Sequence, residues 1–270
     1  MSDALRKRVL TAVVLGAALL AILLWLPEWA TVAVVTLMVL FGAWEWSAFL
    51  LLGTPPARVG YVLLVGVLLW LVWRFSTSPA RRDLVLAVAV LWWLLALAWI
   101  MFAPRRVSPW AAAAAGVLAL VPSWLALVRL RLTLPDGAQW VLFALVLVWV
   151  ADIGAFFFGR LFGRIRLAPT VSPGKTWEGL LGGVAVSMLV AIIGSRWFQV
   201  PLAAFLPLCL AAVGFSVVGD LTESLLKRSA GVKDSGSVFP GHGGVMDRID
   251  SITGAAPVLL LGLSLLGVIT

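Results

Sequence analysis

The densest group of chemically active side chains lies between residues 220 and 250, in a chain that is otherwise strongly apolar. Its first members follow at helical spacing: Asp220, Glu223, Ser224 and Lys227. This spacing places them along one face of a helix, so one stripe carries both signs of charge. Two further carboxylates, Asp247 and Asp250, share a face if their helix begins near residue 245. Each group alone could be an interfacial salt-bridge cluster, but two groups flanking one glycine-rich loop favour a functional site.

The segment that separates these two groups adds cations, glycines and the single histidine of the chain. The residues of interest there and just beyond it are Arg228, Lys233, Asp234, His242, Gly243, Gly244 and Arg248. Carboxylates on neighbouring helices suit Mg²⁺, which prefers oxygen ligands, whereas one histidine and one cysteine disfavour zinc. Cations and glycine amides suit phosphate groups. His242 could donate to a phosphate or simply cap the loop, and both interpretations remain open.

A second polar segment begins at Asp152 and ends with Ser172, Lys175, Thr176 and Glu178. Its Gly-Lys-Thr is similar to a phosphate-binding P-loop, but that motif needs glycine where Pro169 stands, and no strand is expected before it. The segment instead predicts a turn that opens a helix, whose N-terminus would suit a phosphate. The alternative is an ordinary helix start, capped by Ser172 or Thr176.

The elements that must position these residues are membrane helices. The 270 residues are 63% hydrophobic and 12% charged, and successive apolar runs approach the roughly 20 residues that span a bilayer. The runs do not alternate as the strands of a β-barrel would. We therefore expect an all-α polytopic integral membrane protein with about nine transmembrane helices. The expected spans are 9–26, 29–52, 60–75, 83–103, 109–130, 137–159, 177–198, 201–220 and 252–269.

The acidic residues are distributed unevenly along the chain: most of those that could take part in chemistry follow residue 137. We expect residues 1–136 to form a scaffold of helices and residues 137–270 to form the catalytic region of the same membrane unit. Glu45 is the exception, since it lies inside the second apolar run, where a carboxylate needs a partner or a water-filled cavity. Pairing with an arginine and a role in the active site are equally open for it.

Basic residues predict the orientation. Arg6, Lys7 and Arg8 precede the first span, and most of the 20 Lys and Arg residues then fall on the same side, so a cytoplasmic N-terminus is expected. The net charge of +8 suits anionic lipid head groups and does not indicate nucleic acid. The polar segments, which lie on the same side, are expected to face the cytoplasm.

Together these motifs resemble the phosphatidate cytidylyltransferase (CDP-diacylglycerol synthase) family of integral membrane enzymes. Residues 224–250 meet the family pattern S-x-x-K-R-x4-K-D-x-G-x2-[hydrophobic]-P-G-H-G-G-x-x-D-R-x-D. The Ser-Pro-Gly-Lys-Thr-Trp-Glu-Gly block at residues 172–179 is also similar to that family. The first half of the chain matches only in its hydrophobic character.

The resemblance implies transfer of the cytidylyl group of CTP to phosphatidate, with Mg²⁺ as cofactor, in a bacterial inner membrane and in a protein that forms a homodimer. It implies a metal site at Asp220, Asp247 and Asp250. The implied catalytic residues are Asp220, Lys227, Arg228, Lys233, Asp234, His242 and Arg248. The implied substrate-binding residues are Ser172, Lys175, Thr176, Glu178, Glu223, Ser224, Gly243 and Gly244.

Two other classes of protein compete with this interpretation. A lipid kinase or a CDP-alcohol phosphotransferase also needs Mg²⁺ and carboxylates, but the D-G-x2-A-R motif of the latter is absent and a hydroxyl acceptor would call for a clearer base. A transporter would carry its charges near the bilayer midplane in broken helices, whereas here the charges gather on one side.

Overall fold

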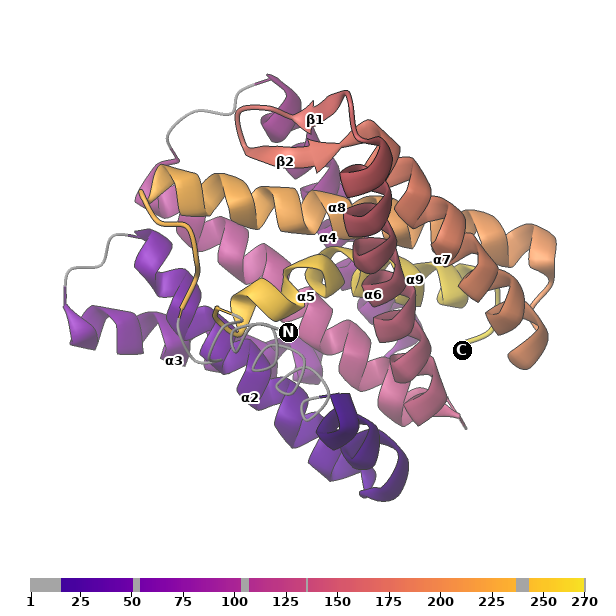
Figure 1. Cartoon of the computed structure of the whole chain (residues 1–270). Helices are drawn as coiled ribbons and strands as arrows, with labels where there is room; N and C mark the ends of the chain where they lie inside the picture. Colours follow the sequence, from indigo (N-terminus) through magenta and orange to yellow (C-terminus); the bar gives the residue numbers. More distant parts are fainter. Residues whose placement is uncertain (1–15, 51–53, 103–106, 135, 237–242, 270) are drawn as a thin grey trace.

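The structure is a computed structural model that describes residues 16–50, 54–102, 107–134, 136–236 and 243–269. Nearly all of these residues are helical (Figure 1). Within them, eight helices are long and apolar enough to cross a membrane, and a shorter apolar helix spans Gly16–Trp25. The long ones are α2 (Glu28–Trp46, continued by the 3-10 helix η1, Ser47–Leu50), α3 (Pro55–Phe75), α4 (Pro79–Phe102), α5 (Pro109–Thr133), α6 (Gly137–Phe162), α7 (Trp177–Trp197), α8 (Leu202–Ser229) and α9 (Met246–Leu265). The expected polytopic helical membrane protein is confirmed.

Several boundaries differ from the expected ones for identifiable reasons. Helix α3 begins at Pro55 rather than near residue 60, because the prolines open the helix at its first positions instead of ending the preceding one. Helix α8 continues to Ser229, and α9 already begins at Met246, so both carry their polar residues on helix beyond the predicted apolar spans. Residues 9–15 of the first expected span lie outside the described residues.

A short β-hairpin between α6 and α7 is the element that the sequence did not predict. Strand β1 (Arg166–Ala168) pairs antiparallel with β2 (Ser172–Thr176), with Arg166 opposite Thr176 and Ala168 opposite Ser172. The expectation that no strand precedes Gly-Lys-Thr was therefore wrong. The P-loop interpretation still fails, because Lys175 and Thr176 belong to the second strand of the hairpin and not to a loop that could wrap a phosphate.

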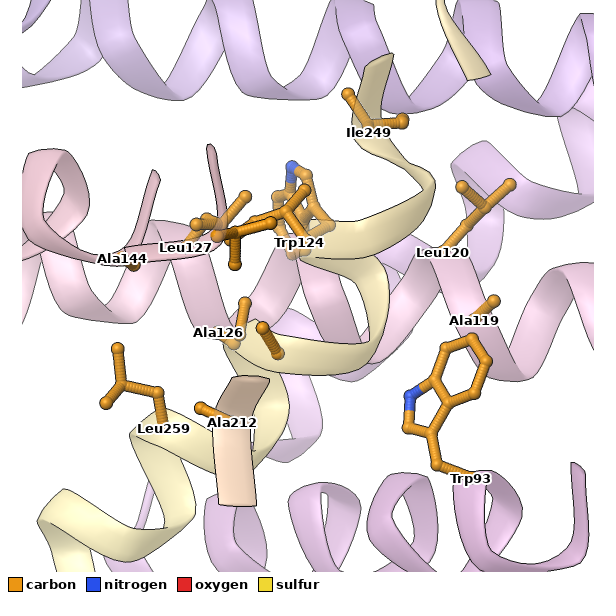
Figure 2. Close-up of a cluster of buried hydrophobic side chains, with 14 of the residues drawn as sticks. Trp93, Ala119, Leu120, Trp124, Ala126, Leu127, Ala144, Ala212, Ile249 and Leu259 are labelled. Atoms are coloured by element: carbon orange, nitrogen blue, oxygen red, sulfur yellow. The ribbon is translucent and has the colours of Figure 1, made fainter. Parts of the chain in front are cut away.

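Helix α9 lies at the centre of the bundle, in contact with α2, α4, α5, α6 and α8 (Figure 1). Helices α5 and α9 are the most buried of the membrane-spanning helices in the described part of the chain. Figure 2 shows part of the core around them, a buried cluster that includes Leu259 of α9, Trp124 of α5 and Ala212 of α8. Helices from both halves of the chain thus share one core, and that core holds the polar start of α9 in place.

Two pairs of helices approach each other through glycine. A Cβ at Gly219 of α8 would lie 2.5 Å from the Asp250 carbonyl oxygen, and a Cβ at Gly254 of α9 would overlap the Phe215 carbonyl oxygen. Gly179 and Gly183 of α7 lie equally close to the backbone of α6. They form a G-x-x-x-G pair, a spacing that lets two helices approach closely. These approaches bring the polar residues of α8 next to those of α9 and the hairpin next to α6.

Candidate active site

A cavity of about 480 Å³ lies where α6, α7, α8, α9 and the hairpin meet. Four carboxylates line it, together with the cations Lys175 and Arg160: Asp152 from α6, Asp220 from α8, and Asp247 and Asp250 from α9. The remaining wall is largely apolar, with residues such as Phe156, Leu180 and Val217. The cavity therefore suits a ligand that has both a charged part and an apolar part.

The hairpin delivers Lys175 to this cavity. Strand β2 ends at Thr176, whose side-chain oxygen accepts a hydrogen bond from the Gly179 amide at 3.2 Å and caps α7. This is the ordinary helix start that the sequence left open as an alternative. Lys175 then forms an ion pair with Asp220, and both side chains are only partly exposed. Ser224 donates a longer hydrogen bond, 3.4 Å, to the other oxygen of Asp220.

Lys227 joins α8 to α9. Its ammonium lies 2.7 Å from Glu223 Oε2, one turn earlier on α8, and 2.6 Å from Asp247 Oδ1 at the start of α9. Glu223 is almost fully buried, with 1% of its side chain exposed, and its second oxygen has no hydrogen-bond partner among the described residues. One cation thus faces two carboxylates, so this cluster carries negative charge that a bound cation could offset.

The second oxygen of Asp247 is held by the polypeptide itself. Asp247 Oδ2 accepts hydrogen bonds from the Gly244 amide at 2.8 Å, the Ser235 amide at 3.1 Å and the Ser235 hydroxyl at 2.8 Å. Gly243, next to this contact, has a φ of +79°, which glycine adopts without a Cβ clash. With Lys227 on its other oxygen, the carboxylate of Asp247 has a fixed orientation.

Asp250 and Asp152 complete the acidic wall. Asp250 is buried, and its Oδ1 accepts a hydrogen bond from the Ser251 amide at 2.8 Å. Asp152 was given no role in the sequence interpretation, although it faces the cavity. The available signal was an ionisable residue inside an apolar helical run, which by itself indicates a functional position in a membrane protein.

The donor set suits a hard cation such as Mg²⁺, because four carboxylates face one cavity and Mg²⁺ binds oxygen ligands. In the described part of the chain, no three His, Cys, Asp or Glu side chains are gathered closely enough to hold one ion between them. Mg²⁺ commonly takes only one or two carboxylates and completes its shell with water and substrate phosphates. The residues therefore fit a metal site that is shared with a substrate, and not a closed cage of protein ligands.

The remaining predicted residues lie around this centre. Arg228, Lys233, Asp234 and Arg248 are exposed. Glu178 accepts hydrogen bonds from the Arg164 and Ile165 amides and so ties the base of the hairpin to α7. Ser172 opens β2, Gly244 binds Asp247, and His242 lies outside the described residues. The substrate-binding and catalytic roles of these residues stay predictions.

Fold and site define a polytopic integral membrane protein with an interhelical cavity that is charged in one part and apolar in the rest. Sequence comparison then gives its family. The profile of the cytidylyltransferase family matches residues 6–266, and the chain belongs to that family.

Two relatives are similar over almost the whole chain, and a third over slightly less than half of it. The phosphatidate cytidylyltransferase of Haemophilus influenzae is 40% identical over 279 residues, covering 94% of this chain and 96% of the relative. The phosphatidate cytidylyltransferase of Pseudomonas aeruginosa is 40% identical over 268 residues, covering 94% and 95%. The one from Synechocystis is 46% identical over 129 residues, which is 46% of this chain and 43% of the relative.

Proposed function

We propose that this protein transfers the cytidylyl group of CTP to phosphatidate, forming CDP-diacylglycerol and pyrophosphate. The observation that carries the proposal is the meeting of three separate motif segments at one cavity: Lys175 of the hairpin pairs with Asp220 of α8, and Lys227 of α8 pairs with Asp247 of α9. Membership of the cytidylyltransferase family, and relatives that carry the name of this activity, support the same reaction.

The cavity suits the two substrates for chemical reasons. Phosphatidate combines an anionic phosphate with acyl chains, and the cavity combines Lys175 and Arg160 with an apolar wall. The acyl chains would lie along residues such as Phe156 and Val217, while the phosphate would remain near the polar part. CTP would bring its phosphates to the same cations from the aqueous side.

The reaction needs no dedicated base. The phosphate oxygen of phosphatidate is already anionic at neutral pH, so attack on the α-phosphorus of CTP needs positioning and charge neutralisation more than proton removal. Lys175 would hold the nucleotide phosphates, and Lys227 would keep Asp247 and Glu223 in place. The fixed carboxylate of Asp247 costs no reorganisation when the ligands arrive, which is how preorganised sites lower a barrier.

Mg²⁺ is the proposed cofactor. Its predicted ligands come from Asp220, Asp247 and Asp250, of which one or two would bind one ion, and Asp152 is a further carboxylate on the same wall. When bound, it would supply positive charge to the phosphates and to the departing pyrophosphate. The excess of carboxylates over cations around the cavity supports this part of the proposal.

We further propose that the protein resides in the bacterial inner membrane with its cavity open to the cytoplasm, and that it forms a homodimer. The distribution of Lys and Arg in the sequence supports the orientation. The homodimer rests on the family resemblance alone, and light scattering of the purified protein in detergent would test it.

The decisive experiment uses purified protein in detergent with CTP labelled in its cytidine, phosphatidate and Mg²⁺. The expected products are a labelled CDP-lipid and one pyrophosphate for each lipid formed. Diacylglycerol in place of phosphatidate is the matched control, because it offers a hydroxyl to a lipid kinase but no phosphate to a cytidylyltransferase. A folded, monodisperse protein that forms neither product, or that phosphorylates diacylglycerol instead, would overturn the proposal.

A further inference from the structure

Glu45 is a buried carboxylate on α2 that the proposed reaction does not use directly. Only 4% of the residue is exposed. Its partners are the start of α9 and the segment that precedes it: Oε1 accepts from the Val245 amide at 3.0 Å, and Oε2 accepts from the Met246 amide at 2.7 Å. The sequence left open pairing with an arginine or a role in the active site. The structure shows neither directly: the carboxylate accepts hydrogen bonds from backbone amides, and Glu45 does not line the cavity.

These contacts give α9 a cap from a distant part of the chain. The first amides of a helix have no partner within the helix, and a negative charge there is favoured by the helix dipole. Val245, the residue that precedes α9, forms no side-chain capping hydrogen bond. Glu45 supplies that cap from about 200 residues earlier in the sequence. Helix α2 packs closely enough for this, since a Cβ at Gly42 would lie 3.2 Å from the side chain of Ile249.

A hydroxyl links Glu45 to the site. The Ser235 Oγ lies 3.2 Å from Glu45 Oε2 and 2.8 Å from Asp247 Oδ2, so it bridges the two carboxylates, and its single proton can serve one of them at a time. The Asp247 amide in turn donates to Ser235 Oγ at 3.3 Å. Glu45, Ser235 and Asp247 therefore form one hydrogen-bonded network that runs from α2 to the cavity wall.

The backbone approaches the Glu45 carboxylate so closely that only glycine fits at two positions. A Cβ at Gly236 would overlap Glu45 Oε1, and a Cβ at Gly244 would overlap both Glu45 Oε2 and Ser235 Oγ. Gly236, seven residues after α8, and Gly244, two residues before α9, thus both lie against the carboxylate. Gly244 also donates its amide to Asp247, so the same backbone contacts both carboxylates.

We propose that Glu45 is a positioning residue for the reaction: through the start of α9 and through Ser235, it fixes the orientation of Asp247. This inference rests on the proposed function. It assigns to the N-terminal half of the chain a part in the active site, and it explains why a carboxylate is kept inside an apolar helix at the cost of its desolvation.

The test compares Glu45→Gln with Glu28→Gln, which removes a carboxylate from the same helix where it is paired with Arg131 and half exposed. Glutamine keeps the shape of the glutamate side chain, but its NH2 group would face the backbone amides of Val245 or Met246, which are also donors. We expect turnover to fall about 10- to 100-fold, as for other displacements of a catalytic group, with the KM for CTP within about threefold of the wild type. Hydrogen exchange should become faster in residues 243–249, and Glu28→Gln should change neither turnover nor exchange.

The outcomes separate the inference from the proposed function. Wild-type turnover in Glu45→Gln, or unchanged exchange in residues 243–249, would overturn the positioning role. If the wild type makes no CDP-lipid, the proposed function fails, and the exchange measurement still tests whether Glu45 holds the start of α9. If Glu45→Gln does not fold, Ser235→Ala decides, because it breaks the bridge and leaves the amide contacts of Glu45: a lower turnover supports the inference, and an unchanged turnover contradicts it.

Discussion

At the scale of single residues, the site is built from ion pairs that each join two elements. Lys175 links the hairpin to α8, and Lys227 links α8 to α9. A buried or half-buried pair is sensitive to the loss of one partner, because the charge that remains is left uncompensated. Substitutions here should therefore act on the reaction through both charge and geometry.

Asp247→Asn tests the carboxylate that this network holds most firmly. The NH2 group of the asparagine side chain would face either Lys227 or the backbone amides of Ser235 and Gly244. All of these groups are donors, so one hydrogen bond would be replaced by a contact between two donors. We expect turnover to fall by about 100-fold or more while expression is kept. Asp136→Asn, at an exposed helix start, is the control. Asp247→Asn with wild-type turnover would remove this residue from the metal site.

Lys175→Ala tests the cation that faces the cavity from β2. Loss of a charge-assisted contact to the nucleotide phosphates should raise the KM for CTP about tenfold or more, with a smaller effect on the KM for phosphatidate. Arg196→Ala removes an exposed cation from the last turn of α7 and should change neither value. The measurement is initial rate against CTP concentration, and an unchanged KM would count against the nucleotide-binding role.

Asp152→Asn tests the carboxylate that the motifs did not include. If Asp152 contributes to the cation site, its loss should raise the Mg²⁺ concentration that gives half-maximal turnover several-fold, because one of four carboxylates on the wall is neutralised. Asp136→Asn again serves as the control. A Mg²⁺ titration that superimposes on that of the wild type would show that Asp152 has no part in metal binding.

At the scale of elements, the site depends on how closely α8 and α9 approach. Gly219 and Gly254 each face the backbone of the other helix, so the two helices touch where Asp220 and Asp250 must face one cavity. In a membrane, close packing of this kind replaces the hydrophobic effect as the force that joins helices. The crossing therefore contributes to stability and to the site at once.

Gly254→Ala should separate these helices, because its Cβ would overlap the Phe215 carbonyl oxygen. We expect the free energy of unfolding to fall by about 1–3 kcal/mol and turnover to fall with it. Gly214→Ala on α8 is a matched control, since a Cβ there meets nothing within 4 Å and alanine favours the helix. Thermal unfolding in detergent and the turnover of both variants would check this, and equal behaviour of the two would contradict it.

At the scale of the whole molecule, the polar residues gather at one end of a bundle whose N-terminal and C-terminal helices share a core. Helix α9 occupies the middle of that bundle and begins at the site. The N-terminal helices thus do more than span the bilayer, since α2 and α5 pack directly against α9. The orientation of the bundle then decides which compartment supplies CTP.

Sidedness can be measured in membrane vesicles, because CTP does not cross a bilayer. With the proposed cytoplasmic site, inverted vesicles should form CDP-lipid from external CTP, and right-side-out vesicles should do so only after permeabilisation with mild detergent. Vesicles that contain the Asp247→Asn variant give the background of the host. Activity of intact right-side-out vesicles with external CTP would place the site on the opposite face.

Much of the fold could be predicted from the sequence, because the length of an apolar run reports directly on whether a helix crosses the membrane. The charged stripe on α8 was also predictable, since helical spacing alone aligns Glu223 with Lys227. The hairpin could not be predicted, because its strands are only three and five residues long and β2 lies against helices from separate parts of the chain, α6, α7 and α8. The boundary at Pro55 was missed, because prolines open that helix before its apolar part. The start of α9 at Met246 lies before the expected span 252–269 but agrees with the helix start near residue 245 that the pair Asp247 and Asp250 required.

By itself, the sequence determined that this is a helical membrane protein, and it predicted that segments 172–178 and 220–250 carry its chemistry, because residue type and spacing are local properties. Only the tertiary structure decided that Asp152 faces the same cavity and that Glu45 caps α9, because these relations join positions far apart in the chain. Such contacts follow from how helices pack, and the spacing of residues along one helix does not specify its neighbours.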